Sequence, residues 1–300
     1  MSIHCTLPEI RKGQVSSPAM KQRTLERRVS LAGAGLFTGE KATLWIGPAE
    51  AGAGIIFQRT DLPRKPLFPA TLEYVQGTPR CTMIGQQGAL IQTVEHLLSA
   101  IKACQIDNAL IEIHGPEIPI LDGSAKGFVE LIEQAGITIQ TEDRVWGKLE
   151  RPVFWSHEDT HIVAFPAEEY RISYTLHYPH SSFIGSQYFS LVCDETQFKN
   201  EIAPSRTFSL YEEIVPLIEK GFLKGGNLSN AILIRENRVV NPEGLRFRDE
   251  MVRHKILDLL GDLSLIGISF CAHVIAIRSG HASNIAFAKE LAKNLTMENV

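Results

Sequence analysis

The sequence predicts an α+β protein of two similar domains packed as a sandwich, and three observations support this class. Short β-type segments broken by glycine and proline fill residues 24–75, a pattern typical of antiparallel strands. Apolar residues then recur at helical spacing in 91–106 and 124–137, around a strand-like segment at 108–115. A similar order of strands, helix, apolar strand and helix returns in the second half. We therefore predict a duplicated unit of one sheet and two helices.

The second half repeats this order with different spacing. Its strands are expected at "HIVAFPA", "YRISYTLHY" and "QYFSLV", followed by a helix at 209–222. A second helix around 253–263, a strand at 272–280 and a last helix at 282–295 complete the copy. If the copies match, His96 and His254 begin equivalent helices, and a two-domain sandwich brings them face to face.

The length of 300 residues exceeds that of one typical domain, and "QTEDRVWGK" is a charged connector between the halves. We expect a loose polar extension at 1–20, a first domain at 21–142 and a second domain at 143–300. The net charge of -4 provides no basic footprint for nucleic acid. No segment is apolar enough for a signal peptide or a transmembrane span.

Five cysteines, odd in number and never in a CxxC pair, are typical of a reduced protein. We therefore expect a cytoplasmic protein, and we expect it to be a monomer.

The stretch "RHKILDLLGDL" places His254 and Asp258 one helical turn apart on a largely apolar helix. Two side chains in this relation can grip one metal ion, and zinc enzymes often take two ligands from one helix and a third from elsewhere. A partly buried histidine satisfied by a neighbouring aspartate is the ordinary alternative, and this pair alone does not decide between them.

The stretch "TVEHLLSA" places Glu95 beside His96 on an otherwise apolar helix. An ionised carboxylate is costly to bury, so a glutamate here needs a reason. His96 can supply the third ligand while Glu95 acts as general base on an attacking water. A glutamate that merely complements the dipole of a helix N-terminus is the alternative reading.

Two further stretches carry candidate catalytic groups. His281 in "RSGHASNI" follows a strand and precedes a helix, and a protonated imidazole there can stabilise negative charge and donate to a leaving amine. Asp262 lies one turn beyond Asp258 and can hold His281 charged and oriented. Thr207 in "APSRTFSL" can stabilise an oxyanion, although threonine at a helix start is more often an N-cap.

Together these stretches resemble the UDP-3-O-acyl-N-acetylglucosamine deacetylases, the zinc enzymes of lipid A biosynthesis in Gram-negative bacteria. The similarity covers nearly the whole chain from about Lys21. It includes "GLFTGE", "TVEHLLSA", "IDNALIEIHGPEIPILDGSA", "SRTF", "GLRFRDEMVRHKILDLLGDL" and "SGHASN" in this order. The resemblance implies hydrolysis of the N-acetyl group of UDP-3-O-acyl-N-acetylglucosamine, with release of acetate.

The resemblance also implies a role for each matching residue. One Zn2+ ion would be held by His96, His254 and Asp258. Glu95 would be the general base, and His281 would be the catalytic histidine with Asp262 as its partner. Thr207 would donate a hydrogen bond to the oxyanion, and Lys255 would line the substrate site.

The family fold implies two related α+β domains, each with a small insert, and an active site between them. The second insert would form an apolar passage for the acyl chain at about 208–226. Its candidate lining residues are Phe208, Leu210, Ile214 and Phe222, with simple helix packing as the alternative. Tyr178 matches an aromatic position that stacks on uracil, and Phe37 replaces a histidine common in the family, without expected loss of activity.

Two other functions remain open at this stage. Many amide-cleaving enzymes combine zinc with a glutamate, so a zinc peptidase or another amidohydrolase is one alternative. A non-catalytic protein that binds a sugar nucleotide or lipid around a structural metal is the other. Structural zinc sites usually have four Cys or His ligands, whereas here three ligands stand beside a base, which favours catalysis.

Overall fold

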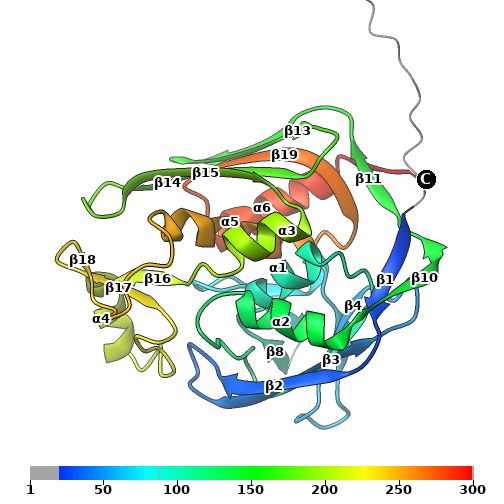
Figure 1. The fold of residues 1–300 in the computed structure, drawn as a ribbon, viewed down its shortest axis with the longest axis horizontal. Helices are drawn as coiled ribbons and strands as arrows, with labels where there is room; N and C mark the ends of the chain where they lie inside the picture. The colour runs from blue at the N-terminus through cyan, green and yellow to red at the C-terminus, as the bar shows by residue number, and fades with distance from the viewer. Residues whose placement is uncertain (1–19, 87, 299–300) are drawn as a thin grey trace, which may run out of the picture.

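The structure, a computed structural model, describes residues 20–86 and 88–298, so almost all of the expected extension at 1–20 lies outside it. Its sheets and helices form a mixed α+β fold, which confirms the predicted class. In Figure 1 the two largest sheets lie on opposite sides, and helices α1, α2, α5 and α6 lie between them. The proposed division between residues 142 and 143 remains a prediction.

The first lobe is built from strands β1–β10 and two helices. Its main sheet has the order β2 (Val29–Ala34), β3 (Lys41–Pro48), β9 (Ala109–His114), β4 (Ile55–Arg59), β5 (Leu67–Pro69). Two smaller sheets are β6 (Val75–Gly77), β7 (Met83–Gln86), β8 (Ala89–Ile91), and β1 (Lys21–Leu25) with β10 (Ile137–Asp143). The helices are α1 (Glu95–Ala103) and α2 (Lys126–Ala135), and Leu72–Tyr74 forms a 3-10 turn.

The second lobe contains strands β11–β20 and the remaining helices. Its large sheet contains β12 (Val153–His157), β13 (Thr160–Pro166), β19 (Ser269–Ile277), β14 (Arg171–Tyr178), β15 (Gly185–Val192), β11 (Trp146–Leu149) and β20 (Leu295–Glu298). The helices are α3 (Glu195–Gln197), a π-helix at Phe198–Ile202, α4 (Tyr211–Glu219), α5 (Glu250–Ser264) and α6 (His281–Ala292).

The two large sheets share one strand order. In the first lobe β2, β3, β9, β4 and β5 are neighbours in that order, and only the β9–β4 pair is parallel. In the second lobe β12, β13, β19, β14 and β15 repeat the order, again with one parallel pair, β19–β14. This common topology supports the duplicated unit that the sequence predicts.

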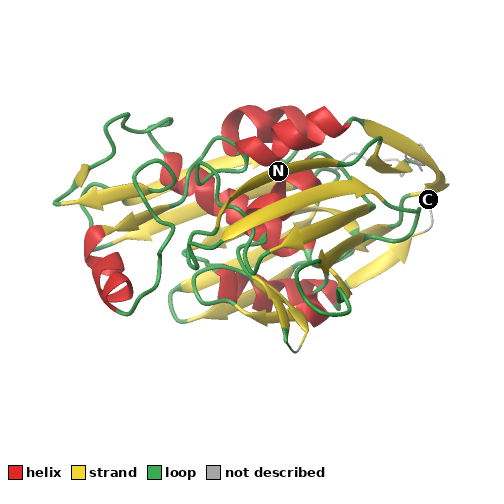
Figure 2. Ribbon diagram, turned by 90° about the horizontal axis from the view of Figure 1, so that it is seen from below, coloured by secondary structure: helices red, strands yellow, loops and turns green. Residues whose placement is uncertain are grey.

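A small unit projects from the second lobe. Strand β16 (Phe208–Leu210) pairs in parallel with β17 (Ile232–Arg235), which pairs with β18 (Arg238–Val239), and α4 follows β16 directly. Figure 2 shows this unit at the left end of the molecule. It extends beyond the predicted insert at 208–226, because the strand that completes it begins at Ile232.

Alternating side chains build the core between the sheets. Along β3, Ala42, Leu44 and Ile46 are buried while the intervening residues are partly exposed, as the two-residue period of a one-sided strand requires. Helix α5 is buried along most of its length, including His254, Asp258 and Asp262. Among the described residues, no helix is both long and apolar enough to cross a membrane.

Candidate active site

Helices α1 and α5 approach each other closely because of a glycine. A β-carbon at Gly261 would lie 2.1 Å from the main-chain carbonyl oxygen of Glu95, well inside van der Waals contact. Only glycine therefore lets α5 rest on the first turn of α1. This contact brings the polar residues of the two helices to one seam between the lobes.

Three buried side chains converge at this seam. His96 comes from α1, whereas His254 and Asp258 come from α5, and one potential ligand atom from each lies within 4.8 Å of the others. The Asp258 Oδ1 atom lies 3.3 Å from His254 Nε2 and 3.7 Å from His96 Nε2. Two imidazole nitrogens and a carboxylate oxygen form a donor set that suits a zinc-like divalent cation.

The protonation states of these groups fit a ligand role. Burial lowers the pKa of His96 to about 3, with the neighbouring His254 adding to the effect. Burial likewise lowers the pKa of His254. Burial opposes ionisation of Asp258, but His254 and Lys255 hold the pKa of its carboxyl well below its usual value. The chain thus presents neutral imidazoles and an ionised carboxylate, the forms that bind a metal.

The tautomer of His254 follows from its hydrogen bond. His254 Nδ1 lies 3.0 Å from the main-chain carbonyl oxygen of Ser205. A carbonyl can only accept, so Nδ1 carries the proton and Nε2 keeps its lone pair toward Asp258. In contrast, His96 Nδ1 is buried and has no hydrogen-bond partner within the described chain.

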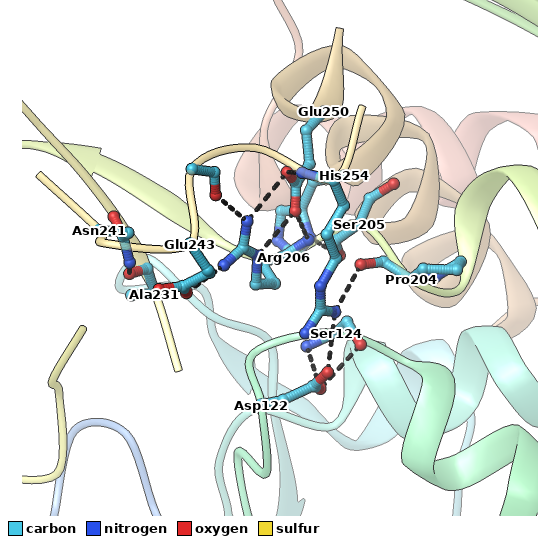
Figure 3. Close-up of polar contacts among 12 residues, drawn as sticks. Asp122, Ser124, Pro204, Ser205, Arg206, Ala231, Asn241, Glu243, Glu250 and His254 are labelled. Carbon is cyan, nitrogen blue, oxygen red and sulfur yellow. Dashed lines mark hydrogen bonds and ion pairs between the residues drawn. The ribbon is translucent and has the colours of Figure 1, made fainter. Parts of the chain in front are cut away.

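A buried ion pair fixes the segment that carries Ser205 (Figure 3). Arg206 Nε donates to Glu250 Oε1 at 2.8 Å, and the Arg206 main-chain N–H donates to the same oxygen at 3.0 Å. Both side chains are almost fully buried, and Glu243 binds the outer edge of the guanidinium. The pair therefore anchors the residues on either side of Arg206, which are Ser205 and Thr207.

Thr207 is also held by the first lobe. Its main-chain N–H donates to the carbonyl of Gly123 at 2.8 Å, and the Ala125 N–H donates to Ala203 at 2.9 Å. Gly123 has φ +84°, and a β-carbon there would lie 2.0 Å from the Asn230 carbonyl oxygen. The two lobes are thus joined by main-chain hydrogen bonds at the point where Thr207 meets the site.

Glu95 and His281 face each other across the same space. Glu95 Oε1 lies 3.7 Å from His281 Nε2, and His281 Nδ1 lies 2.9 Å from Asp262 Oδ2. Burial raises the pKa of Glu95 to about 8, although the His281 charge opposes this. Burial opposes a charge on His281, but Asp262 and Glu95 outweigh it and raise the pKa of His281 to about 10. The arrangement places a carboxyl that titrates near neutral pH beside a protonated imidazole, and such a pair can exchange protons with a substrate.

A cavity of about 440 Å³, called the front cavity, collects most of the predicted site residues. Ten of them line it: Glu95, His96, Tyr178, Thr207, Phe208, Ile214, His254, Lys255, Asp258 and His281. Asp262 is fully buried behind His281. Leu210 and Phe222 are not among the lining residues, and Phe222 is 54% exposed.

Much of the apolar part of the front cavity comes from the projecting unit, and Leu36, Phe37 and Ile120 of the first lobe also line it. The projecting unit contributes Leu217, Ile218, Leu223, Leu228 and Leu233, none of which the sequence analysis selected. Ile214, Leu217 and Ile218 follow the i, i+3, i+4 spacing of one helix face, so this periodicity could have identified them.

Polar and aromatic groups of the front cavity meet beside the donor set. Lys255 Nζ donates to Asp258 Oδ2 at 2.8 Å and lies 5.5 Å from the centre of the Phe208 ring. Tyr178 contacts the same ring, with centroids 5.9 Å apart. A cation and two aromatic rings therefore lie beside the donor set.

The family model for UDP-3-O-acyl N-acetylglycosamine deacetylase (LpxC) matches residues 22–293. The chain belongs to this family. Three curated relatives, each named UDP-3-O-acyl-N-acetylglucosamine deacetylase, are from Chlamydia pneumoniae, Chlamydia muridarum and Chlamydia felis. They are 50%, 48% and 47% identical to the chain over 274 to 277 residues, covering 91–92% of the chain and 96–98% of each relative.

Within this deacetylase family the chain carries Phe37 in its "GLFTG" motif. Phe37 lines the front cavity, and its main-chain N–H donates to Glu117, whose buried carboxylate also accepts from Thr38 and Thr93. The main chain of this motif is therefore fixed by Glu117, and this hydrogen bond does not involve the side chain at position 37.

Several residues that support the site were missed by sequence reasoning. Asn284 donates to Asp262 at 2.8 Å, and Thr82 contacts both Glu95 and Asp262. Asn284 lies in the "SGHASN" motif, but nothing in that motif indicates Asp262 as its partner, and Thr82 is 180 positions from Asp262 in the sequence. Only the fold brings these partners together.

Proposed function

We propose that the chain hydrolyses the N-acetyl amide of UDP-3-O-acyl-N-acetylglucosamine to give UDP-3-O-acyl-glucosamine and acetate, a step of lipid A biosynthesis. One observation carries this proposal: a base, a three-ligand donor group and a protonated acid line the same cavity, which continues into an apolar compartment. The near-complete match to curated deacetylases supports the same substrate.

We further propose Zn2+ as the cation of His96, His254 and Asp258. A zinc ion there would polarise the acetyl carbonyl and lower the pKa of a water molecule from about 15.7 toward 7. Among the described residues three side chains converge, so a bound zinc would keep a coordination position for that chemistry.

The side chains then divide the proton transfers among themselves. Glu95 accepts a proton from the water as its oxygen attacks the acetyl carbon. The Thr207 hydroxyl and the His281 imidazolium donate to the oxygen that becomes negative. The C–N bond breaks as the amine takes a proton from His281 or from the newly protonated Glu95, and acetate leaves. Asp262 keeps His281 charged and oriented throughout.

The cavity also accounts for the rest of the substrate. The apolar side chains of the projecting unit would hold the acyl chain, and Lys255 and Tyr178 would contact the polar nucleotide sugar. The cysteines of the described chain are unpaired, which supports a cytoplasmic location, where a nucleotide sugar is also expected.

A substrate panel tests the function. The purified chain should release acetate from UDP-3-O-acyl-N-acetylglucosamine and should leave N-acetylated peptides uncleaved. Cleavage of the peptides with no acetate from the nucleotide sugar would instead identify a peptidase.

Metal analysis tests the ligand assignment separately. His254→Ala should lose bound zinc, because one of three donors is removed. His273→Ala is the matched control, since this histidine lies on β19 and binds Ser173 at 2.8 Å away from the donor set. Undiminished zinc in His254→Ala would remove that residue from the coordination sphere.

A further inference from the structure

Thr82 is a buried residue of the first lobe that contacts the catalytic groups of both lobes. It directly precedes β7, and its exposed fraction is 0%. Its main-chain N–H donates to Glu95 Oε2 at 3.0 Å, and its carbonyl accepts from the Val94 N–H at 3.3 Å. The main chain of Thr82 therefore fixes both the start of α1 and the carboxylate on its first turn.

The hydroxyl of Thr82 crosses the seam to the second lobe. Its Oγ1 donates to Asp262 Oδ1 at 2.5 Å and lies 3.4 Å from His281 Nδ1. The other oxygen of Asp262 accepts from His281 Nδ1 at 2.9 Å and from Asn284 at 2.8 Å. An ionised carboxylate only accepts, so the hydroxyl proton points to Asp262 and completes its set of donors.

We propose that Thr82 is a positioning residue that holds Glu95 and the His281–Asp262 pair in one geometry across the seam. This inference rests on the proposed deacetylation, in which both groups act on one substrate. Asp262 is fully buried, so loss of the hydroxyl would leave Oδ1 without a donor. The carboxylate would turn to recover one, and His281 would turn with it.

Two substitutions separate the hydroxyl from the rest of the residue. Thr82→Val keeps the shape and the main-chain bond to Glu95 but removes the hydroxyl, whereas Thr82→Ser keeps the hydroxyl. A small displacement of an acid or base costs large factors in rate, so Thr82→Val should lower kcat by about 10- to 100-fold. KM should stay within about 2-fold, because ground-state binding is retained. Thr82→Ser should restore most of kcat.

Thr24→Val is the matched control for losing a buried hydroxyl. Thr24 is 6% exposed, and its hydroxyl donates to the Asn108 carbonyl at 2.7 Å, in a contact that involves no front-cavity residue. It should lose stability as Thr82→Val does and keep the parental kcat. An equal loss of kcat in both variants would show that Thr82 acts only through stability.

A double-substitution cycle tests whether Thr82 works through His281. In the His281→Ala background, Thr82→Val should lower kcat by less than about 3-fold, because the group it positions is already absent. An undiminished 10- to 100-fold effect in that background would contradict this route.

Proton NMR gives a readout that does not depend on turnover. The hydrogen-bonded Nδ1–H of His281 should give a downfield signal that is lost in His281→Ala. This signal should move in Thr82→Val and stay in Thr82→Ser. Parental kcat in folded Thr82→Val, or an unmoved signal, would overturn the proposal. Failure of the proposed function can be distinguished from failure of the Thr82 proposal. If the proposed function is wrong, the parental chain releases no acetate, but the NMR comparison still shows whether Thr82 positions His281.

Discussion

Helices α1 and α5 line two cavities of similar size, and only one has the chemistry of an active site. The front cavity has a volume of about 440 Å³. Its lining residues from the earlier turns of the two helices are Glu95, His96, His254 and Asp258. A second cavity of about 470 Å³, called the back cavity, is lined by their later turns, among other residues. Its helical lining residues are Leu98, Ile101, Lys102, Ala103, Leu260 and Ser264.

The charged groups of the back cavity are each held by a neighbour, and within the described residues they form no candidate metal-binding group. Lys102 Nζ lies 3.3 Å from both the Ile268 carbonyl oxygen and Ser269 Oγ, and Arg144 pairs with Asp107 at 2.7 Å. In the front cavity, by contrast, two histidines and an aspartate converge as potential metal ligands, with Glu95 and His281 beside them. The difference shows that convergence, more than volume, distinguishes a reactive cavity.

The largest expected effect comes from the base of the front cavity. Glu95→Gln keeps the shape of the side chain but cannot accept the proton, so kcat should fall by about 10²- to 10⁴-fold. The metal content, measured by elemental analysis, should match that of the parental chain. Asp107→Asn makes the same change in the back cavity and should keep kcat. A parental rate in Glu95→Gln would remove Glu95 from the base role.

The ion pair behind the front cavity should have the next largest effect. Arg206→Met leaves the buried Glu250 carboxylate without its cation, which costs about 3–5 kcal/mol of unfolding free energy. Chemical denaturation measures this loss, and metal affinity should fall because the Ser205 carbonyl is no longer fixed against His254. Arg235→Met is the control, since Arg235 is exposed and its contact with Glu236 is at the surface. Equal stability of the two variants would contradict the anchoring role.

The seam between the helices should give a smaller effect. Gly261→Ala forces a β-carbon against the Glu95 carbonyl, and such overpacking costs about 1–3 kcal/mol. kcat should also fall, because the first turn of α1 must move. Gly127→Ala on α2 is the matched helical control, since its β-carbon would meet only the flexible end of Leu121. Similar denaturation midpoints for the two variants would show that α1 and α5 can accommodate a β-carbon at position 261 without strain.

The smallest expected effect comes from the back cavity. Burial lowers the pKa of Lys102 to about 8, below the 10.4 or so of an unfolded lysine. Between pH 8 and 10.4 or so the unfolded chain holds the Lys102 proton more tightly than the folded chain does. The free energy of unfolding therefore rises with pH in this range, and the destabilisation caused by burying the Lys102 charge is fully present below pH 8.

Lys102→Met removes this cost. It should stabilise the chain by about 1 kcal/mol at pH 7, a value reduced for the partial exposure of the side chain. The rise of stability between pH 8 and 10 should flatten while kcat stays unchanged. Lys289→Met, at an exposed lysine, controls for the loss of one charge. An unchanged pH profile of denaturation in Lys102→Met would refute the assignment.

Sequence reasoning predicted the groups that depend on local spacing. His254 and Asp258 are one turn apart, and Glu95 adjoins His96 on an apolar helix, so both patterns are visible in the sequence. Strand segments broken by glycine likewise predicted the α+β class.

Contacts between residues far apart in the sequence could not be predicted in this way. Gly261 against Glu95, Thr82 against Asp262 and the Arg206–Glu250 pair join residues that no periodic pattern links. Phe222 was predicted to line the acyl passage as an apolar residue of the insert, but it follows the end of α4 at Glu219, and where such a side chain lies depends on its packing partners.

The shared strand order of the two sheets has a consequence for how such a site diversifies. Each copy contributes one imidazole, and the rings meet edge to face with centroids 5.0 Å apart. Beyond this common element the copies differ: the first supplies the buried carboxyl of Glu95, and the second supplies the His281–Asp262 pair. A fold that repeats itself about a central junction can thus bring unlike groups from twin halves to one cavity.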